Sequence, residues 1–304
     1  MSFELHERKP IEDELVKVVR RELRHTIDAL TATAASAVGE EAVHEARKSV
    51  KKVRAVAAFL EHAGTKPRRK DRKRLKTAAR ALSKLRDSAA VVETFDRVRH
   101  RYPKQLSDHT YSILRRGLAA SRDREHERAQ RDGVVGKAVQ RLKAARKSAR
   151  HWPSSSMEVS DVGEIVAVSY RRSRAAMKHA RTTNLSATLH NWRKEVKTLW
   201  YHLRLIKPLT TGVAPMVAGL KRLEAELGED HNLVVLAATL RGCRDLRTMR
   251  ASIRHIGRLA ARMRQPLRRR VFAHARRLYV RTPKAFAHWI RRSVRSRPRQ
   301  AAAA

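Results

Sequence analysis

Two stretches of the sequence repeat one pattern: VHEARKSVKKVRAVAAFLE at residues 43–61 and LHNWRKEVKTLWYHLRLIK at residues 189–207. Each contains His-x-x-Arg-Lys-x-x-Lys, and 146 residues separate His44 from His190. Apolar residues recur at alternating intervals of three and four, which predicts two amphipathic helices, each with one buried seam. The seam positions are Val43, Ala46, Val50, Val53, Ala57 and Leu60 in the first stretch and Leu189, Trp192, Val196, Leu199, Leu203 and Ile206 in the second.

A second pair of segments repeats in the same order. LSKLRDSAAVV, from Leu82, aligns with LGEDHNLVVL, from Leu227, at an offset of 145 residues, which pairs Lys76 with Lys221 and Asp87 with Asn232. Two helix pairs kept in register indicate a duplicated helical unit. Because short loops favour antiparallel neighbours, we expect an all-α fold of two four-helix bundles related by a pseudo-twofold axis.

Helical spacing continues along almost the whole chain, and no convincing alternation of strand type is found. We expect the first bundle at residues 1–155, the second at 156–296 and a frayed tail at 297–304, the two bundles together forming a single domain. The stretch WPSSSMEVS at 152–160 is the predicted linker. The predicted helices are 11–37, 40–62, 69–100 and 107–151, with an interruption at Asp132-Gly133, then 161–181, 186–207, 213–241 and 245–294, with a kink or break at Pro266 and at Pro283.

The charge of the chain is strongly one-sided. Lys and Arg total 70 against 29 Asp and Glu, a formal net charge of +41 among 304 residues. Such a charge opposes compaction unless anions are near, so a polyanionic partner is the first hypothesis. The single cysteine, Cys243, excludes an intrachain disulfide and fits a reducing compartment. No run is long and apolar enough for a membrane span.

The cations of the repeated motif lie on one face of each helix, beside the seam, because they are spaced at i, i+3, i+4 and i+7. Like charges at this spacing repel one another, so the face favours an anionic ligand; the alternative is an ordinary solvated surface. The helix at 69–100 adds a further basic face. These residues are His44, Arg47, Lys48 and Lys51, then His190, Arg193, Lys194 and Lys197, and on the third helix Lys73, Lys76, Arg80 and Lys84.

The remaining polar signals do not indicate catalysis. His44 and His190 either contact a ligand or link the two units, and neither has a partner at metal-ligand spacing. Asp87 and the Glu-Asp-His stretch that ends at His231 are predicted to form interhelical ion pairs that orient basic side chains. No nucleophile–base pair and no glycine-rich phosphate loop is present. We therefore expect no enzyme activity, no cofactor and no metal.

This pattern resembles the conserved histidine α-helical domain (CHAD) family over about residues 5–295. The resemblance implies two four-helix bundles, a central basic surface that binds inorganic polyphosphate, and recruitment to polyphosphate granules. Arg204 and Asn232 stand where it implies acidic residues. The implied polyphosphate-binding positions are His44, Arg47, Lys48, Lys51, Arg54, His190, Arg193, Lys194 and Lys197, with Lys76, Arg80, Lys84 and Lys221 lining the neighbouring helices.

The preferred interpretation is a non-enzymatic polyphosphate-binding protein located in the cytoplasm on polyphosphate granules. The alternative is a protein that binds nucleic acid non-specifically through the same faces, since charge alone serves both. Against the alternative, aromatic residues make up only 5% of the chain and no base-reading motif is found. The sequence leaves homo-oligomerisation open.

Overall fold

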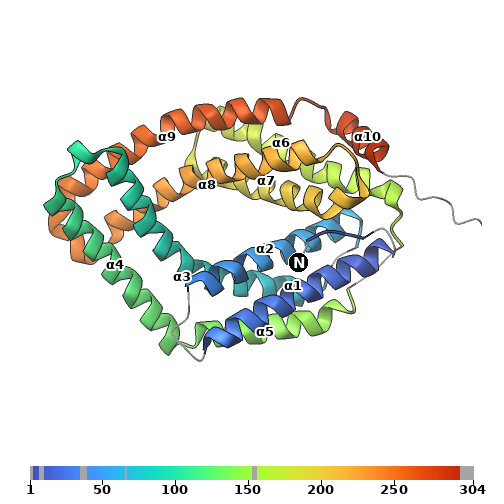
Figure 1. The fold of residues 1–304 in the computed structure, drawn as a ribbon, viewed down its shortest axis with the longest axis horizontal. Coiled ribbons are helices and arrows are strands. Elements are labelled where there is room, and N and C mark those ends of the chain that lie inside the picture. The colour runs from blue at the N-terminus through green and yellow to red at the C-terminus, as the bar shows by residue number, and fades with distance from the viewer. Residues whose placement is uncertain (1–2, 7–9, 35–39, 66, 153–155, 295–304) are drawn as a thin grey trace, which may run out of the picture.

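The computed structural model describes residues 3–6, 10–34, 40–65, 67–152 and 156–294 (Figure 1). Within those ranges the regular structure is helical, apart from an isolated antiparallel bridge between Thr210 and Val294. The predicted all-α fold is therefore confirmed. No described helix is long and apolar enough to cross a membrane.

The helices of the first half follow the predicted order. Gly133 has a φ of +59°, a left-handed conformation that glycine adopts without strain, and it separates two helices at the predicted interruption. The predicted end of the first helix at residue 37 lies outside the described residues. The elements are α1 (Ile11–Ala34), α2 (Glu40–His62), α3 (Arg69–Arg101), η1 (Pro103–Gln105), α4 (Asp108–Arg131) and α5 (Val134–Ala149).

The second half departs from expectation at one proline. α9 continues through Pro266, so of the predicted kink or break the break is wrong and the kink stays a prediction; Pro266 is exposed, where water can satisfy the carbonyl that the proline leaves without a backbone donor. The predicted break at Pro283 is confirmed: Pro283 opens α10, and the Thr282 hydroxyl caps it by accepting from the amide of Ala285 at 3.2 Å. The elements are η2 (Val159–Asp161), α6 (Val162–Thr183), α7 (Ser186–Ile206), η3 (Lys207–Leu209), α8 (Ala214–Gly242), η4 (Arg244–Met249), α9 (Arg250–Leu278) and α10 (Pro283–Ser293).

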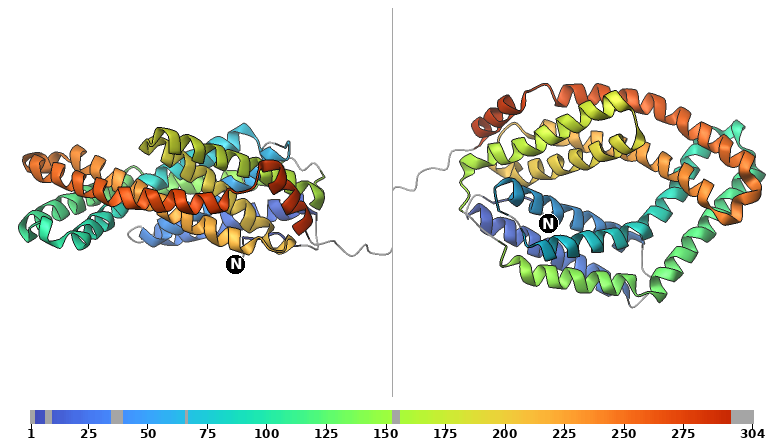
Figure 2. Two further views of the ribbon diagram at one scale, coloured as in Figure 1. Left: turned by 90° about the horizontal axis from the view of Figure 1, so that it is seen from above. Right: turned by 180° about the vertical axis from the view of Figure 1, so that it is seen from behind.

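The helices form a flattened ring (Figures 1 and 2). In the first half, α1, α2, α3 and α5 pack on one another. In the second half, α6 packs on α7 and α10, α7 on α8, and α8 on α9. Helix α2 contacts α6 and α7, and α3 contacts α8, so the halves meet along these helices. The pseudo-twofold axis and the bundle boundary at residue 155 remain predictions.

The repeated seam is buried as predicted. All twelve seam positions belong to the core, and the most exposed of them, Ala57, has only 6% of its surface accessible. Trp192 is fully buried and stacks on Phe272 of α9, with ring centroids 5.4 Å apart. Each helix therefore has one fixed rotation about its axis, and this fixes where its basic face lies.

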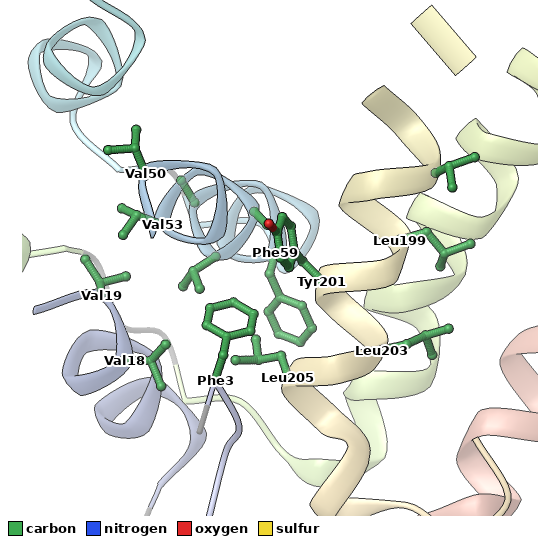
Figure 3. Packing of buried hydrophobic residues seen from close by; sticks show 14 of the residues in the cluster. Phe3, Val18, Val19, Val50, Val53, Phe59, Leu199, Tyr201, Leu203 and Leu205 are labelled. Atoms are coloured by element: carbon green, nitrogen blue, oxygen red, sulfur yellow. The ribbon is translucent and has the colours of Figure 1, made fainter. Parts of the chain in front are cut away.

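One apolar cluster extends through both halves of the chain, from α1, α2, α3 and α5 to α6, α7 and α10 (Figure 3). The N-terminal residue Phe3 packs edge-on against Tyr201 of α7 at 5.6 Å, and the amide of Leu5 donates to the carbonyl of Leu205 at 2.8 Å. A second cluster joins the far parts of α3 and α8 with α4 and the start of α9. The two halves are thus bound by shared core.

A buried histidine also connects the halves. The Nε2–H of His202 on α7 donates to the carbonyl of Ala55 on α2 at 2.8 Å, and its Nδ1 accepts from the Ser169 hydroxyl of α6 at 2.7 Å. A neutral ring satisfies both contacts. Complete burial lowers the pKa of His202 to about 3, although the hydrogen bond to Ala55 opposes the shift. This histidine ties α2 to α7 immediately beside the basic faces.

Candidate functional site

The basic faces of α2 and α7 meet where these two helices pack. The charges of Lys197 and Arg193 on α7 act directly on Lys51 of α2, together with that of Arg47 on the same helix. Burial first, and these neighbouring cations second, lower the pKa of Lys51 from 10.5 to about 7. Four cations that belong to equivalent positions of the repeat therefore form one cluster, which we call the central cluster: Arg47, Lys51, Arg193 and Lys197.

A single carboxylate holds the α7 side of the central cluster. Oε1 of Glu224 on α8 accepts from Nζ of Lys197 at 2.9 Å and from Nε of Arg193 at 3.1 Å. The Glu224 side chain is only 13% exposed, and the side chains of Arg193 and Lys197 are 24% and 20% exposed. The negative charge of Glu224 on α8 also favours the charged form of Lys51 on α2.

The pKa values follow from this arrangement. Burial lowers the pKa of Lys197, and Glu224 only partly offsets that effect. Burial alone would raise the pKa of Glu224, but attraction to Lys197 and Arg193 outweighs it, so the pKa is lowered. Glu224 is therefore ionised at neutral pH, and the cluster carries more positive than negative charge.

Gly228 makes room for the Arg193 guanidinium. A Cβ atom at Gly228 would lie 3.1 Å from Nη2 and 3.4 Å from Cζ of Arg193. Such contacts are tighter than a side chain normally accepts, so the absence of a side chain on α8 lets the guanidinium lie flat against that helix beside Glu224. Arg193 is thus positioned by both α7 and α8.

The two motif histidines lie beside the cluster in different surroundings. His44 is half-buried on α2. The ring of His190 lies against that of His231 on α8, with centroids 4.2 Å apart and planes at 33°. In the described part of the chain, no group of three or more His, Cys, Asp or Glu residues could hold a metal ion. His44 and His190 each precede an arginine of the central cluster by three residues, and their role stays a prediction.

The other predicted site residues are not drawn into the central cluster. Lys48 points to Glu45 on its own helix, with Nζ and Oε1 2.6 Å apart, and the Lys48 hydrogen bond lowers the pKa of that carboxyl. Lys194 is exposed one residue from Arg193. The remaining predicted cations are exposed and make no ion pair with any residue that the structure describes; they are Arg54 on α2, Lys76, Arg80 and Lys84 on α3, and Lys221 on α8.

The two halves differ in charge on the helix that flanks the motif. The repeat aligns Arg80 of α3 with Ala225 of α8, and Lys84 with Glu229. It likewise aligns Ala79 with Glu224, the carboxylate at the centre of the cluster. At these positions α3 therefore adds cations and no acid, whereas α8 partly neutralises its own half.

The predicted ion pairs are confirmed where they can be described. Asp230 is buried and accepts from Arg264 at 2.9 Å and from Arg268 at 3.0 Å, both on α9. These arginines lie outside the motif, so Asp230 orients α9 and not the central cluster. The side chain of Asp87 lies outside the described residues. Arg204 lies over the Trp200 ring at 5.1 Å.

Comparison with known proteins places this geometry in a family. The model of the CHAD domain matches residues 15–241, three quarters of the chain. The chain belongs to the CHAD domain family. The CHAD match ends before α9. No curated protein matches the chain.

A solved structure shares the CHAD fold. The crystal structure of the CHAD domain from the plant Ricinus communis is similar to this chain with a TM-score of 0.70 and 14% sequence identity. The likeness covers 93% of this chain and 94% of the plant chain. At this identity the comparison establishes the fold of the CHAD domain and does not transfer individual residues.

Proposed function

We propose that this CHAD protein binds inorganic polyphosphate, without chemical turnover, on a surface formed by α2, α3 and α7. The observation that carries the proposal is the central cluster. Arg47, Lys51, Arg193 and Lys197 come from both halves of the chain, and Glu224 accepts hydrogen bonds from the two on α7 and favours the charged form of Lys51. The cations of the cluster lie close enough to one another to lower the pKa of Lys51. A bound anion would offset this repulsion and stabilise the cluster.

The side chains suit phosphate oxygens. Guanidinium groups make forked, charge-assisted hydrogen bonds, and ammonium groups act as compact point charges. A phosphate placed between α2 and α7 would relieve the repulsion at Lys51 and favour its protonated form. Successive phosphates of the same chain would then reach the exposed Lys76, Arg80 and Lys84 of α3.

The second candidate is non-specific nucleic-acid binding through the same cations. Single-stranded nucleic acid is commonly held by aromatic side chains on which bases stack. Trp192 and Tyr201 are buried, and the large hydrophobic residues exposed in the described chain are Leu185 and Val280. The lack of an exposed aromatic platform among the described residues favours a ligand without bases. Association with cytoplasmic polyphosphate granules follows as part of the proposal.

Competition tests the proposal. Labelled polyphosphate and duplex DNA should be compared at matched phosphate concentration over several salt concentrations, because affinity for any polyanion depends on salt. We expect polyphosphate to displace DNA at physiological salt. Equal or stronger binding of DNA at every salt concentration would favour the nucleic-acid candidate.

A further inference from the structure

A ridge of arginines follows the outer side of α9, away from the central cluster. Helix α9 contains ten arginines among 29 residues and no acidic residue or lysine. Figure 1 shows α9 along the outer edge of the ring, and its inner face packs on α8. The ridge consists of Arg254, Arg258, Arg262, Arg269 and Arg276.

The spacing aligns these five residues. They follow one another at intervals of four and seven residues, which keeps them within a narrow arc of the helix surface. All five are exposed. From Arg254 to Arg276 the ridge extends about 33 Å at the helical rise of 1.5 Å per residue. Ile256, Leu267 and Val271 of the same helix are buried. Their packing sets the rotation of α9 and keeps the ridge on its solvent-facing side.

The ridge lacks internal neutralisation. Of the acidic residues that contact α9, Asp230 is taken by Arg264 and Arg268, and Glu226 by His274, all away from the ridge. Arg262 donates to the side-chain oxygen of Gln105 at 3.4 Å, a neutral partner. Arg254, Arg258, Arg269 and Arg276 form no ion pair with any residue that the structure describes. Repulsion along the helix therefore remains until an external anion binds.

We propose that the α9 ridge is a second contact surface for a flexible polyphosphate chain, separate from the central cluster. The inference rests on the proposed function for the identity of the ligand. The exposed positions of α9 that are not basic are Ala251, Ala261, Gln265, Pro266 and Ala273. These offer nothing on which a base could stack and no large apolar group to enter a bilayer. The CHAD family match ends at residue 241, so the ridge is a feature of this chain beyond that match.

Two surfaces on one molecule change how chain length affects affinity. When the central cluster holds one part of a long polyphosphate chain, binding of another part to the ridge is intramolecular. The length of polymer between the two contacts sets the effective concentration for this second contact. A short oligophosphate occupies one surface only. The ridge should therefore strengthen binding of long chains and leave the binding of short ones to the central cluster almost unchanged.

The test compares two variants of equal charge. The ridge variant carries Arg254→Gln, Arg258→Gln, Arg269→Gln and Arg276→Gln. The control variant carries Lys137→Gln, Lys143→Gln, Lys147→Gln and Arg150→Gln, four exposed positions on or next to α5, at the opposite edge of the ring. Circular dichroism and thermal unfolding confirm that both are folded. Affinity for labelled long polyphosphate is then measured over a range of salt concentrations.

We expect the ridge variant to bind long polyphosphate at least about tenfold more weakly than the control variant. If each lost arginine released one phosphate contact, the slope of log K against log salt should fall in magnitude by about 3. Affinity for a short oligophosphate should be the same in both variants. A ridge variant that matches the control with long chains would overturn the inference and leave the ridge a solvated surface.

The experiment distinguishes an error in the ridge proposal from an error in the proposed polyphosphate binding. If the proposed function fails, wild-type protein prefers DNA and Lys51→Gln with Lys197→Gln leaves polyphosphate binding unchanged. If only the ridge proposal is wrong, the Lys51→Gln, Lys197→Gln variant loses polyphosphate binding, whereas the ridge variant binds long polyphosphate as tightly as the control variant. A ridge variant that loses DNA binding alone would assign the ridge to nucleic acid and contradict the inference.

Discussion

Nζ of Lys197 lies 2.9 Å from Oε1 of Glu224, and the repeat cannot form this ion pair in the first half of the chain, where Ala79 occupies the position of Glu224. The acid sits among cations from both halves, and it favours the charged form of Lys51. Glu224 thus occupies hydrogen-bond donors of Arg193 and Lys197 that a bound phosphate would also use. We expect it to organise the free protein and to compete with a bound anion.

Replacing Glu224 with Gln separates these two effects. The free energy of unfolding should fall by about 1.5–3 kcal/mol, because Arg193 and Lys197 lose their charged hydrogen-bond acceptor. Polyphosphate affinity should rise, because the site loses the negative charge that contacts Arg193 and Lys197. Chemical denaturation and binding titration measure the two quantities. Weaker binding in this variant would mean that Glu224 mainly positions the cations, and competition with the anion would be rejected.

Binding should depend on pH through Lys51. Its pKa of about 7 means that the free site loses a positive charge as the pH rises from 6 to 8. Affinity for polyphosphate should fall over that range, and binding near pH 8 should take up a proton, because the anion favours protonated Lys51. Calorimetry in buffers of different ionisation enthalpy measures the uptake. Lys51→Gln is the control, and an identical proton uptake in it would exclude Lys51 as the source.

The same lysine should affect stability in the opposite direction. Between pH 7 and 10.5 the unfolded chain binds more protons at Lys51 than the folded chain, so stability contributed by this position increases as the pH rises. Denaturation of Lys51→Gln should lack that increase, and at pH 7 the variant should be at least as stable as the wild type. A variant that is clearly less stable would show that Lys51 supports the fold.

The buried seam can be tested in both halves at once. Val50 and Val196 occupy equivalent positions and are fully buried. Val50→Asp or Val196→Asp places an unpaired charge in the core and should prevent cooperative folding. Val50→Ala and Val196→Ala are the controls and should only reduce the midpoint of thermal unfolding. Wild-type unfolding of either aspartate variant would show that the seam is misassigned.

His202 should make the joined core sensitive to acid. Its folded pKa is about 3, below its ordinary value of 6.5, so between these values the unfolded chain binds the extra proton. The stability contributed here is present above pH 6.5 and is lost as the pH falls toward 3. His202→Gln should flatten this part of the pH profile, as measured by urea denaturation. An unchanged acid profile would contradict the neutral, buried assignment.

Much of the fold could be predicted because helical periodicity is a local property. The predicted bounds 40–62 coincide with α2, and the seam positions are all buried. A break at Pro266 is wrong because the proline rule does not consider whether the unsatisfied carbonyl faces water. The meeting of Lys51 with Lys197 depends on how α2 packs against α7, which no local pattern contains.

The centre of the site was only partly visible in the sequence. The motif identifies the basic faces, but it cannot show that Lys48 turns to Glu45 while Lys51 joins the cluster. Glu224 was missed, although a signal existed: the 145-residue offset aligns this acid with Ala79 beside a basic face. When two halves of a repeat are aligned, an acidic residue that only one half places beside its basic face indicates an ion pair within the site.

The central claim is that α2 and α7 form one polyphosphate site, and a double-mutant cycle on the binding of a short oligophosphate tests it most directly. The cycle combines Arg47→Gln and Lys51→Gln on α2 with Arg193→Gln and Lys197→Gln on α7, in the ridge variant so that α9 contributes nothing. If one site is shared, either pair should abolish most of the binding and the combination should add little, with one oligophosphate bound per chain when the central cluster is intact in the ridge variant. Two equal sites, each surviving with unchanged affinity when the other pair is replaced, would contradict the account.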